Sequence, residues 1–121
     1  MKSIAFMVTT APFSNLTATA IQIIESALSQ NIPVVGIFFY QDGVLNANKN
    51  IMIASDEYQA LHQWQRLHKT YNLPLHICFT AAEKRGLTDE SEMKNIDESF
   101  IISGLGELVE LSSKADQIAQ L

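Results

Sequence analysis

Cys78 is the residue of this sequence whose type and position best suit chemistry. It lies near the end of an apolar segment, Leu75–Phe79, that is predicted to be a β-strand, and a short helix is predicted just after it at Thr80–Arg85. Free N–H groups at a helix start, here expected from Ala81, Ala82 and Glu83, favour an ionised sulfur, because a thiolate or persulfide is a better acceptor than a thiol. The sequence therefore indicates either a reactive sulfur or, as the structural alternative, a small buried hydrophobic side chain.

A lone cysteine excludes several kinds of thiol site. It allows no internal disulfide, no Cys-x-x-Cys redox pair and no multi-thiolate zinc site. The histidines, His62, His68 and His76, show neither His-x3-His spacing nor a carboxylate partner in the sequence, so no metal site is expected. A phosphatase-type Cys-x5-Arg loop is disfavoured because Lys84 stands at the arginine position. Cys78 is thus the single catalytic candidate, and no cofactor is predicted.

Two other segments resemble ligand-binding motifs only in part. The hydroxyl-rich stretch at residues 9–19 could hold a phosphate, as in a flavodoxin-like flavin site, but Pro12 removes an N–H and no glycine is present, so helix capping is favoured. Gly104-Leu105-Gly106 imitates a dinucleotide motif whose third glycine is replaced by Val109, so helix-start packing is the better account. The alternative to a reactive thiol is a non-catalytic α/β module that binds a small anion or flavin, or serves assembly, with a structural cysteine.

The apolar pattern predicts strand–helix units that would position Cys78. Asn31-Ile32-Pro33 is echoed by Asn72-Leu73-Pro74, and in each case Asn suits a helix end while Pro prevents continuation. Consecutive units of this kind indicate a mainly parallel sheet, whose ligands bind at the carboxyl ends of the strands. The predicted strands are Ser3–Thr9, Pro33–Tyr40, Leu75–Phe79, Phe100–Ser103 and Ile118–Leu121. The predicted helices are Leu16–Gln30, Asp56–Tyr71 (capped by Ser55), Thr80–Arg85 and Leu105–Ser113, with a long loop at Gln41–Ala54.

The composition fits one acidic α/β domain spanning residues 1–121. Of these residues 47% are hydrophobic and the formal net charge is −5, so direct binding to a phosphate backbone is not expected. No apolar run is long enough for a membrane span or a secretory signal, and a cytoplasmic protein is predicted. Trp64 is expected in the core, whereas Ile51–Ile53 suit either the core or a subunit interface.

Over nearly its whole length the sequence resembles the DsrE-like sulfur-relay family. The segments that carry the resemblance follow one another in matching order. They are Phe38-Phe39-Tyr40-x-Asp42-Gly43-Val44-x-Asn46-Ala47-Asn48, Ser55-Asp56-Glu57, Trp64, His76-Ile77-Cys78, Arg85-Gly86, Asp89-Glu90 and Ser103-Gly104-Leu105-Gly106.

The resemblance implies a three-layer α/β/α domain with a five-stranded sheet. It also implies a sulfurtransferase subunit of a heterohexamer with TusB-like and TusC-like related subunits. Cys78 matches the family cysteine that accepts sulfur as a persulfide from a TusA-like donor and passes it to a TusE-like acceptor. That relay ends in 2-thiolation of the tRNA wobble uridine. By the strand-end rule, Thr10–Asn15 and Asn46–Asn48 are expected around the thiol.

Overall fold

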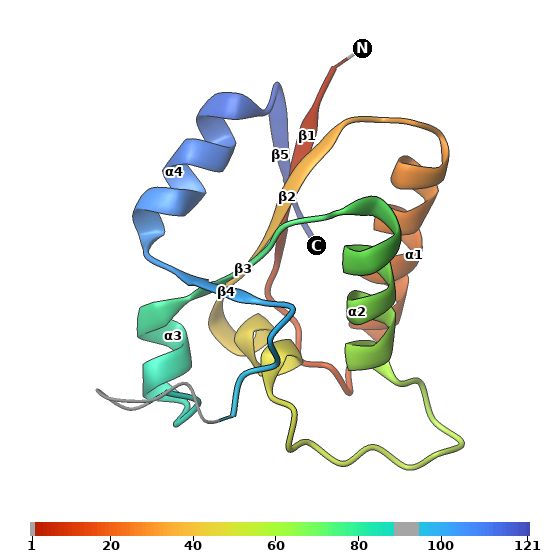
Figure 1. Cartoon of the computed structure of the whole chain (residues 1–121), viewed down its shortest axis with the longest axis vertical. Coiled ribbons are helices and arrows are strands. Elements are labelled where there is room, and N and C mark those ends of the chain that lie inside the picture. Colours follow the sequence, from red (N-terminus) through yellow and green to blue (C-terminus); the bar gives the residue numbers. More distant parts are fainter. Residues whose placement is uncertain (1, 89–94) are drawn as a thin grey trace.

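A five-stranded, fully parallel sheet lies between two helical layers (Figure 1). The computed structural model describes residues 2–88 and 95–121. The strand order is β4-β3-β2-β1-β5, with helices α1 and α2 on one face and α3 and α4 on the other. The elements in chain order are β1 (Ile4–Val8), α1 (Asn15–Ser29), β2 (Val34–Phe39), the 3₁₀ helix η1 (Gln41–Ala47), α2 (Ala60–Tyr71), β3 (Leu75–Cys78), α3 (Phe79–Lys84), β4 (Ile101–Ser103), α4 (Leu105–Lys114) and β5 (Gln117–Gln120).

The predicted fold class is confirmed. The residues at the helix ends cap or end the helices in the way that their types favour. The Ser14 hydroxyl caps α1 by accepting a hydrogen bond from the N–H of Leu16 at 3.1 Å. Asn31 and Asn72, which follow α1 and α2, adopt the left-handed conformation with φ of 62° and 53°. The short side chain of asparagine tolerates this conformation, so both Asn-x-Pro junctions end a helix and lead into a strand.

The structure corrects the prediction between β2 and α2. Helix α2 begins at Ala60 rather than Asp56, because the Gln59 side-chain amide donates to the carbonyls of residues 53, 54 and 57 and so holds the preceding segment in a turn. Ser55 is therefore not the cap of α2. The first half of the predicted long loop is η1, which local periodicity did not indicate.

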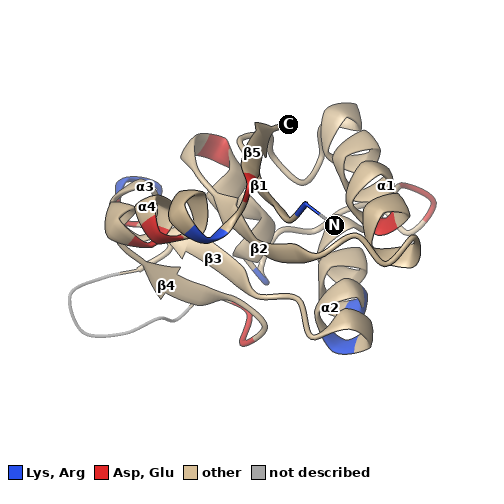
Figure 2. Cartoon of the chain, turned by 90° about the horizontal axis from the view of Figure 1, so that it is seen from above, with Lys and Arg blue, Asp and Glu red and all other residues tan. Residues whose placement is uncertain are grey.

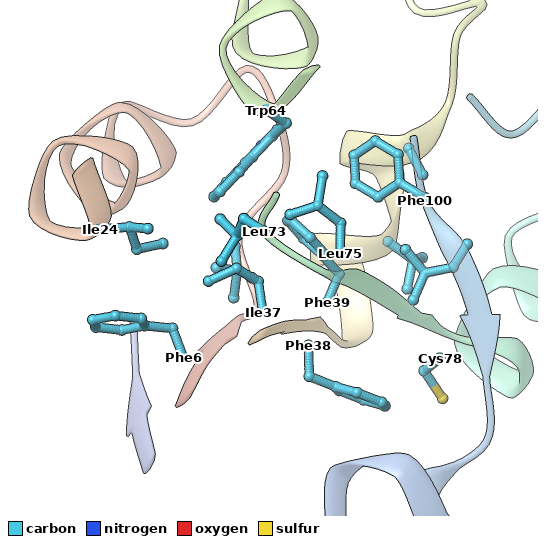
Figure 3. Close-up of a cluster of buried hydrophobic side chains, with 14 of the residues drawn as sticks. Phe6, Ile24, Ile37, Phe38, Phe39, Trp64, Leu73, Leu75, Cys78 and Phe100 are labelled. Carbon is cyan, nitrogen blue, oxygen red and sulfur yellow. The ribbon is translucent and has the colours of Figure 1, made fainter. Parts of the chain in front are cut away.

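The core lies mainly between the sheet and the α1–α2 layer. Phe39 meets Trp64 edge to face, with ring centroids 4.8 Å apart, and packs against Phe100 at 5.3 Å. Figure 3 shows these rings on one side of the sheet, while Phe38 and Cys78 point to the other. Trp64 is fully buried, as predicted. Of the segment 51–53, Met52 is 92% exposed, so its side chain does not belong to the core.

The charged residues lie on the helices and loops around an apolar centre. Strands β1, β2 and β3 contain no Lys, Arg, Asp or Glu (Figure 2), as is typical of a parallel sheet covered by helices on both faces. Arg66 of α2 forms a bidentate ion pair with Glu25 of α1, at 2.6 and 2.9 Å. Since both side chains are substantially exposed, this pair contributes little to stability. Among the described residues, no helix combines the length and apolarity that a membrane crossing requires.

The two edge strands differ in their partners. β5 pairs with β1, so that Ile4 is in register with Gln117 and the first and last strands lie side by side. β4 is a three-residue strand that pairs only with β3 among the described residues. In this pairing Ser103 is the register partner of Cys78. The motif Asp89-Glu90, which contributed to the family resemblance, lies outside the described residues.

Candidate active site around Cys78

Cys78 ends β3 at the carboxyl edge of the sheet, where the sequence placed it. Its side chain is directed to the α4 side (Figure 3), and only 1% of the residue is exposed. Helix α3 begins at Phe79, one residue earlier than predicted, and Cys78 itself is the N-cap residue. The backbone N–H groups nearest the helix start are therefore those of residues 79–81 rather than 81–83. The thiol makes no capping hydrogen bond to them.

A cleft of about 460 Å³ gives access to the Cys78 side chain. Its walls come from the segments that follow β1, β2 and β3 and from the start of α4, which is the arrangement expected at the carboxyl ends of parallel strands. The polar and charged residues that line it include Thr9, Tyr40, Asp42, Thr80, Lys84 and Arg85.

The two loops expected around the thiol lie elsewhere. Of residues 10–15 and 46–48, none lines the Cys78 cleft; Pro12, Asn46 and Asn48 line a separate cleft of about 220 Å³. For residues 46–48 the reason is η1, which turns the chain away from the strand end immediately after Asp42. The rule that ligands bind at the carboxyl ends of parallel strands thus predicted the correct edge of the sheet. The loop residues predicted from it lie too far along the chain from the strand ends to line the cleft.

Arg85 links α3 to η1 beside the cleft. Its Nε and Nη2 each lie 3.0 Å from Oδ1 of Asp42, and its Nη1 donates to the carbonyl of Ala81 at 3.1 Å. Because Asp42 offsets the charge of Arg85, the guanidinium serves chiefly to hold this wall in place. Lys84 also lines the cleft and contributes a positive charge near the thiol.

His76 shares the α4 side of the sheet with Cys78 and has two polar partners. Its Nδ1 lies 2.9 Å from Oγ of Ser103, and its Nε2 lies 3.5 Å from a carboxylate oxygen of Glu107 in α4. The expectation that no histidine has a carboxylate partner is therefore wrong for His76, since the fold brings Glu107 to it from a distant part of the sequence. Burial lowers the pKa of His76, while Glu107 acts to raise it and Lys114 to lower it.

The direction of this pKa shift predicts how stability depends on pH. In the folded state the pKa of His76 lies below its unfolded value of about 6.5, so the folded chain disfavours the proton. This contribution to the free energy of unfolding is complete above pH 6.5 and decreases as the pH falls below it. Urea unfolding between about pH 7.5 and pH 5 should show a smaller acid-induced loss for His76→Gln than for the wild type. Equal losses would contradict the assignment to His76.

The hydroxyl-rich stretch after β1 is used for internal hydrogen bonds. Thr17 donates to the carbonyl of Ala11 at 2.5 Å, its hydroxyl lies 2.7 Å from that of Thr10, and Ser14 caps α1. The prediction that this stretch caps the helix is thus confirmed at Ser14. Gly104 is the N-cap residue of α4, which agrees with the helix-start account of the Gly-Leu-Gly motif.

Asn46 is a buried polar residue whose structural role was not predicted from the sequence. Its amide donates to the carbonyls of Thr10 at 2.9 Å and Gly43 at 2.8 Å, and its oxygen accepts from Nε1 of Trp64 at 3.0 Å. These bonds join the loop after β1, η1 and α2. The sequence placed Asn46 in a family motif and in a loop expected near the thiol, but no local signal distinguishes it from an exposed loop asparagine. Within residues 2–88 and 95–121, no cluster of three or more His, Cys, Asp or Glu is placed to hold a metal ion.

Comparison with known proteins assigns the chain to a family. The model of the DsrE/DsrF-like family matches residues 2–120. The chain belongs to the DsrE/DsrF-like family. One relative, "Sulfurtransferase TusD" of Enterobacter sp. (strain 638), is 37% identical to this DsrE/DsrF-like chain, and the match covers 96% of the chain and 97% of the relative. "Sulfurtransferase TusD homolog" of Haemophilus influenzae is 38% identical, over 84% of the chain and 85% of the relative.

A solved structure supports the DsrE-like fold independently of sequence identity. The crystal structure of the ychN protein from E. coli superposes with a TM-score of 0.76 and covers 100% of both chains. The identity between the two sequences is 20%, so this likeness concerns the fold alone. The predicted family and the predicted α/β/α architecture are both confirmed.

Proposed function

We propose that the protein is a sulfurtransferase that carries sulfur as a persulfide on Cys78. The observation that carries this proposal is the position of the chain's one cysteine, at a strand end within a cleft lined by Lys84 and Arg85. Relatives named sulfurtransferase TusD over most of the chain support the same activity. The flavin alternative loses support because Ser14, Thr10 and Thr17 already have partners within the chain.

Persulfide transfer requires no second cysteine in this chain. The Cys78 thiolate attacks the outer sulfur of a donor persulfide, a new S–S bond forms at Cys78, and the donor's S–S bond breaks to release the donor thiolate. Cys78 then bears the transferred sulfur and can pass it on by the reverse type of exchange. Because 1% of Cys78 is exposed, the reacting group of donor or acceptor must enter the cleft.

The proposed partners are other proteins of a sulfur relay. On this proposal a TusA-like protein donates sulfur, a TusE-like protein accepts it, and TusB-like and TusC-like subunits complete a heterohexamer. The relay ends in cytoplasmic 2-thiolation of the tRNA wobble uridine, and the net charge of −5 agrees with contacts to proteins rather than to RNA by this subunit. Copurification with two related subunits of similar size tests this assembly, whereas purification of the chain alone from its own cell would contradict it.

Mass spectrometry of the whole protein tests the role of Cys78 directly. After incubation with glutathione persulfide, the wild-type chain, purified with its copurifying subunits, should gain the mass of one sulfur atom and lose it on reduction. The Cys78→Ser variant should gain none, because a hydroxyl does not perform this exchange. If Cys78→Ser gains sulfur to the same extent as the wild type, the proposed mechanism is wrong.

A further inference from the structure

We propose that His76 assists the ionisation of Cys78: its imidazole, held by Ser103 and Glu107, takes up the proton that the thiol releases and stabilises the sulfur as an anion. The inference rests on the proposed function of Cys78 and adds a second residue to it. Four groups on two strands and one helix carry the argument.

The first step is the shared face of His76 and Cys78. The two residues are separated by one position in β3, so their side chains leave the sheet on the same side with Cα atoms roughly 6.6 Å apart. The register partner of His76 in β2 is Phe38, whose side chain points to the α4 side together with Cys78 (Figure 3). The contact between His76 and Glu107 of α4 agrees with this direction.

The second step is the position of Ser103. It is the register partner of Cys78 in the neighbouring strand, and adjacent strands lie about 4.8 Å apart. Paired residues of parallel strands direct their side chains to the same face. The Ser103 hydroxyl is therefore a neighbour of Cys78 on that face and is also hydrogen-bonded to Nδ1 of His76, at 2.9 Å. A hydroxyl both donates and accepts, so Ser103 connects the imidazole to the surroundings of the thiol.

The third step concerns charge. The charged groups that face His76 are Glu107 and Lys114 of α4, and strand alternation places Cys78 on the same side of β3. Burial lowers the pKa of His76 and so favours the neutral imidazole, which is the form that can accept a proton. Ionisation of Cys78 adds a negative charge on the same partly buried face, where opposite charges attract more strongly than in water. Glu107, near Nε2, stabilises the imidazolium further.

The proton and the electrons balance in this scheme. Cys78 S–H gives its proton to the Ser103 hydroxyl, which passes its own proton to Nδ1 of His76, and the thiolate electron pair forms the new bond to the donor's outer sulfur. The S–S bond of the donor breaks, its electron pair stays on the donor's inner sulfur, and that thiolate takes a proton from the imidazolium. No oxidant or reductant is consumed.

The test is the pH dependence of sulfur acceptance from glutathione persulfide, measured by mass spectrometry in a single turnover. His76→Gln is expected to accept sulfur about tenfold more slowly at pH 7, because the proton acceptor is lost, and to approach the wild-type rate near pH 9, where hydroxide removes the thiol proton without it. Ser103→Ala should show a smaller loss in the same direction. His62→Gln is the matched control, because His62 is exposed on α2 at the other face of the sheet.

A second measurement keeps the inference testable if His76→Gln folds poorly. The imidazole of His76 is titrated by NMR in the wild type and in Cys78→Ser, which removes the ionising group but leaves the histidine in place. The wild type should retain the His76 proton to higher pH than Cys78→Ser. Identical titrations, or identical rate profiles for His76→Gln and wild type, would overturn the inference. Absence of any sulfur on wild-type Cys78 would instead overturn the proposed function.

Discussion

Replacing Gly43 by alanine is expected to destabilise the fold by more than about 3 kcal/mol, at or beyond the upper end of typical overpacking costs. A Cβ at this position would lie 2.0 Å from the carbonyl oxygen of Val8 and 2.8 Å from its carbonyl carbon. Both are backbone atoms at the end of β1, a buried strand, so they cannot move aside as a flexible side chain does. Urea unfolding followed by the fluorescence of Trp64 measures the change.

Gly106→Ala is the matched control for the Gly43 substitution. A Cβ at Gly106 has no atom within 4 Å, and the residue lies in α4, where alanine is preferred over glycine. This variant should be as stable as the wild type or up to about 1 kcal/mol more stable. Wild-type stability of Gly43→Ala would show that η1 does not pack as closely against β1 as the structure indicates.

Asn46→Asp is expected to cost about 3 kcal/mol or more near neutral pH, despite its nearly unchanged shape. Only 1% of Asn46 is exposed, and its amide nitrogen donates to the carbonyls of Thr10 and Gly43. A carboxylate in its place would face two carbonyl oxygens without a donor and would carry a buried charge. The hydrogen bond that Trp64 donates to this side chain would remain. The loss of stability therefore measures the two missing amide hydrogen bonds and the buried charge.

The pH dependence of Asn46→Asp separates this mechanism from a packing defect. Burial raises the pKa of a carboxyl above its unfolded value of about 3.9, so the variant should lose least stability below that value and most above it. Asn15→Asp is the matched control, because Asn15 is exposed in the first turn of α1, where a carboxylate suits the helix dipole. A loss for Asn46→Asp that is independent of pH would contradict the buried-charge explanation.

The elements that sequence reasoning predicted are those determined by local residue patterns. β1 and β2 are continuous apolar runs and β3 is apolar apart from His76, and the helices before β2 and β3 end at Asn-x-Pro junctions, so their positions could be inferred without the fold. The position of Cys78 at a strand end followed from the same patterns. These elements account for the confirmed architecture and for the edge of the sheet at which the cleft lies.

The features that were missed depend on contacts between distant residues. η1 is held where Gly43 meets β1 and where Asn46 bonds to Trp64, and neither contact leaves a periodic pattern in residues 41–54. The start of α2 was predicted too early because Asp56 and Glu57 suit a helix start, whereas the Gln59 side chain decides the local conformation. Glu107 becomes a partner of His76 only because α4, which connects the edge strands β4 and β5, lies on the face of the sheet to which His76 points.

The pairing of β1 with β5 has a consequence for synthesis of the chain. During translation, β1 leaves the ribosome more than one hundred residues before its partner, since Ile4 pairs with Gln117. Until residues 117–120 have emerged from the exit tunnel, one side of a buried, apolar strand lacks its hydrogen-bonding neighbour. Such an open edge promotes pairing with other chains. The nascent polypeptide therefore passes through a stage in which this edge of β1 is open to pairing with other chains.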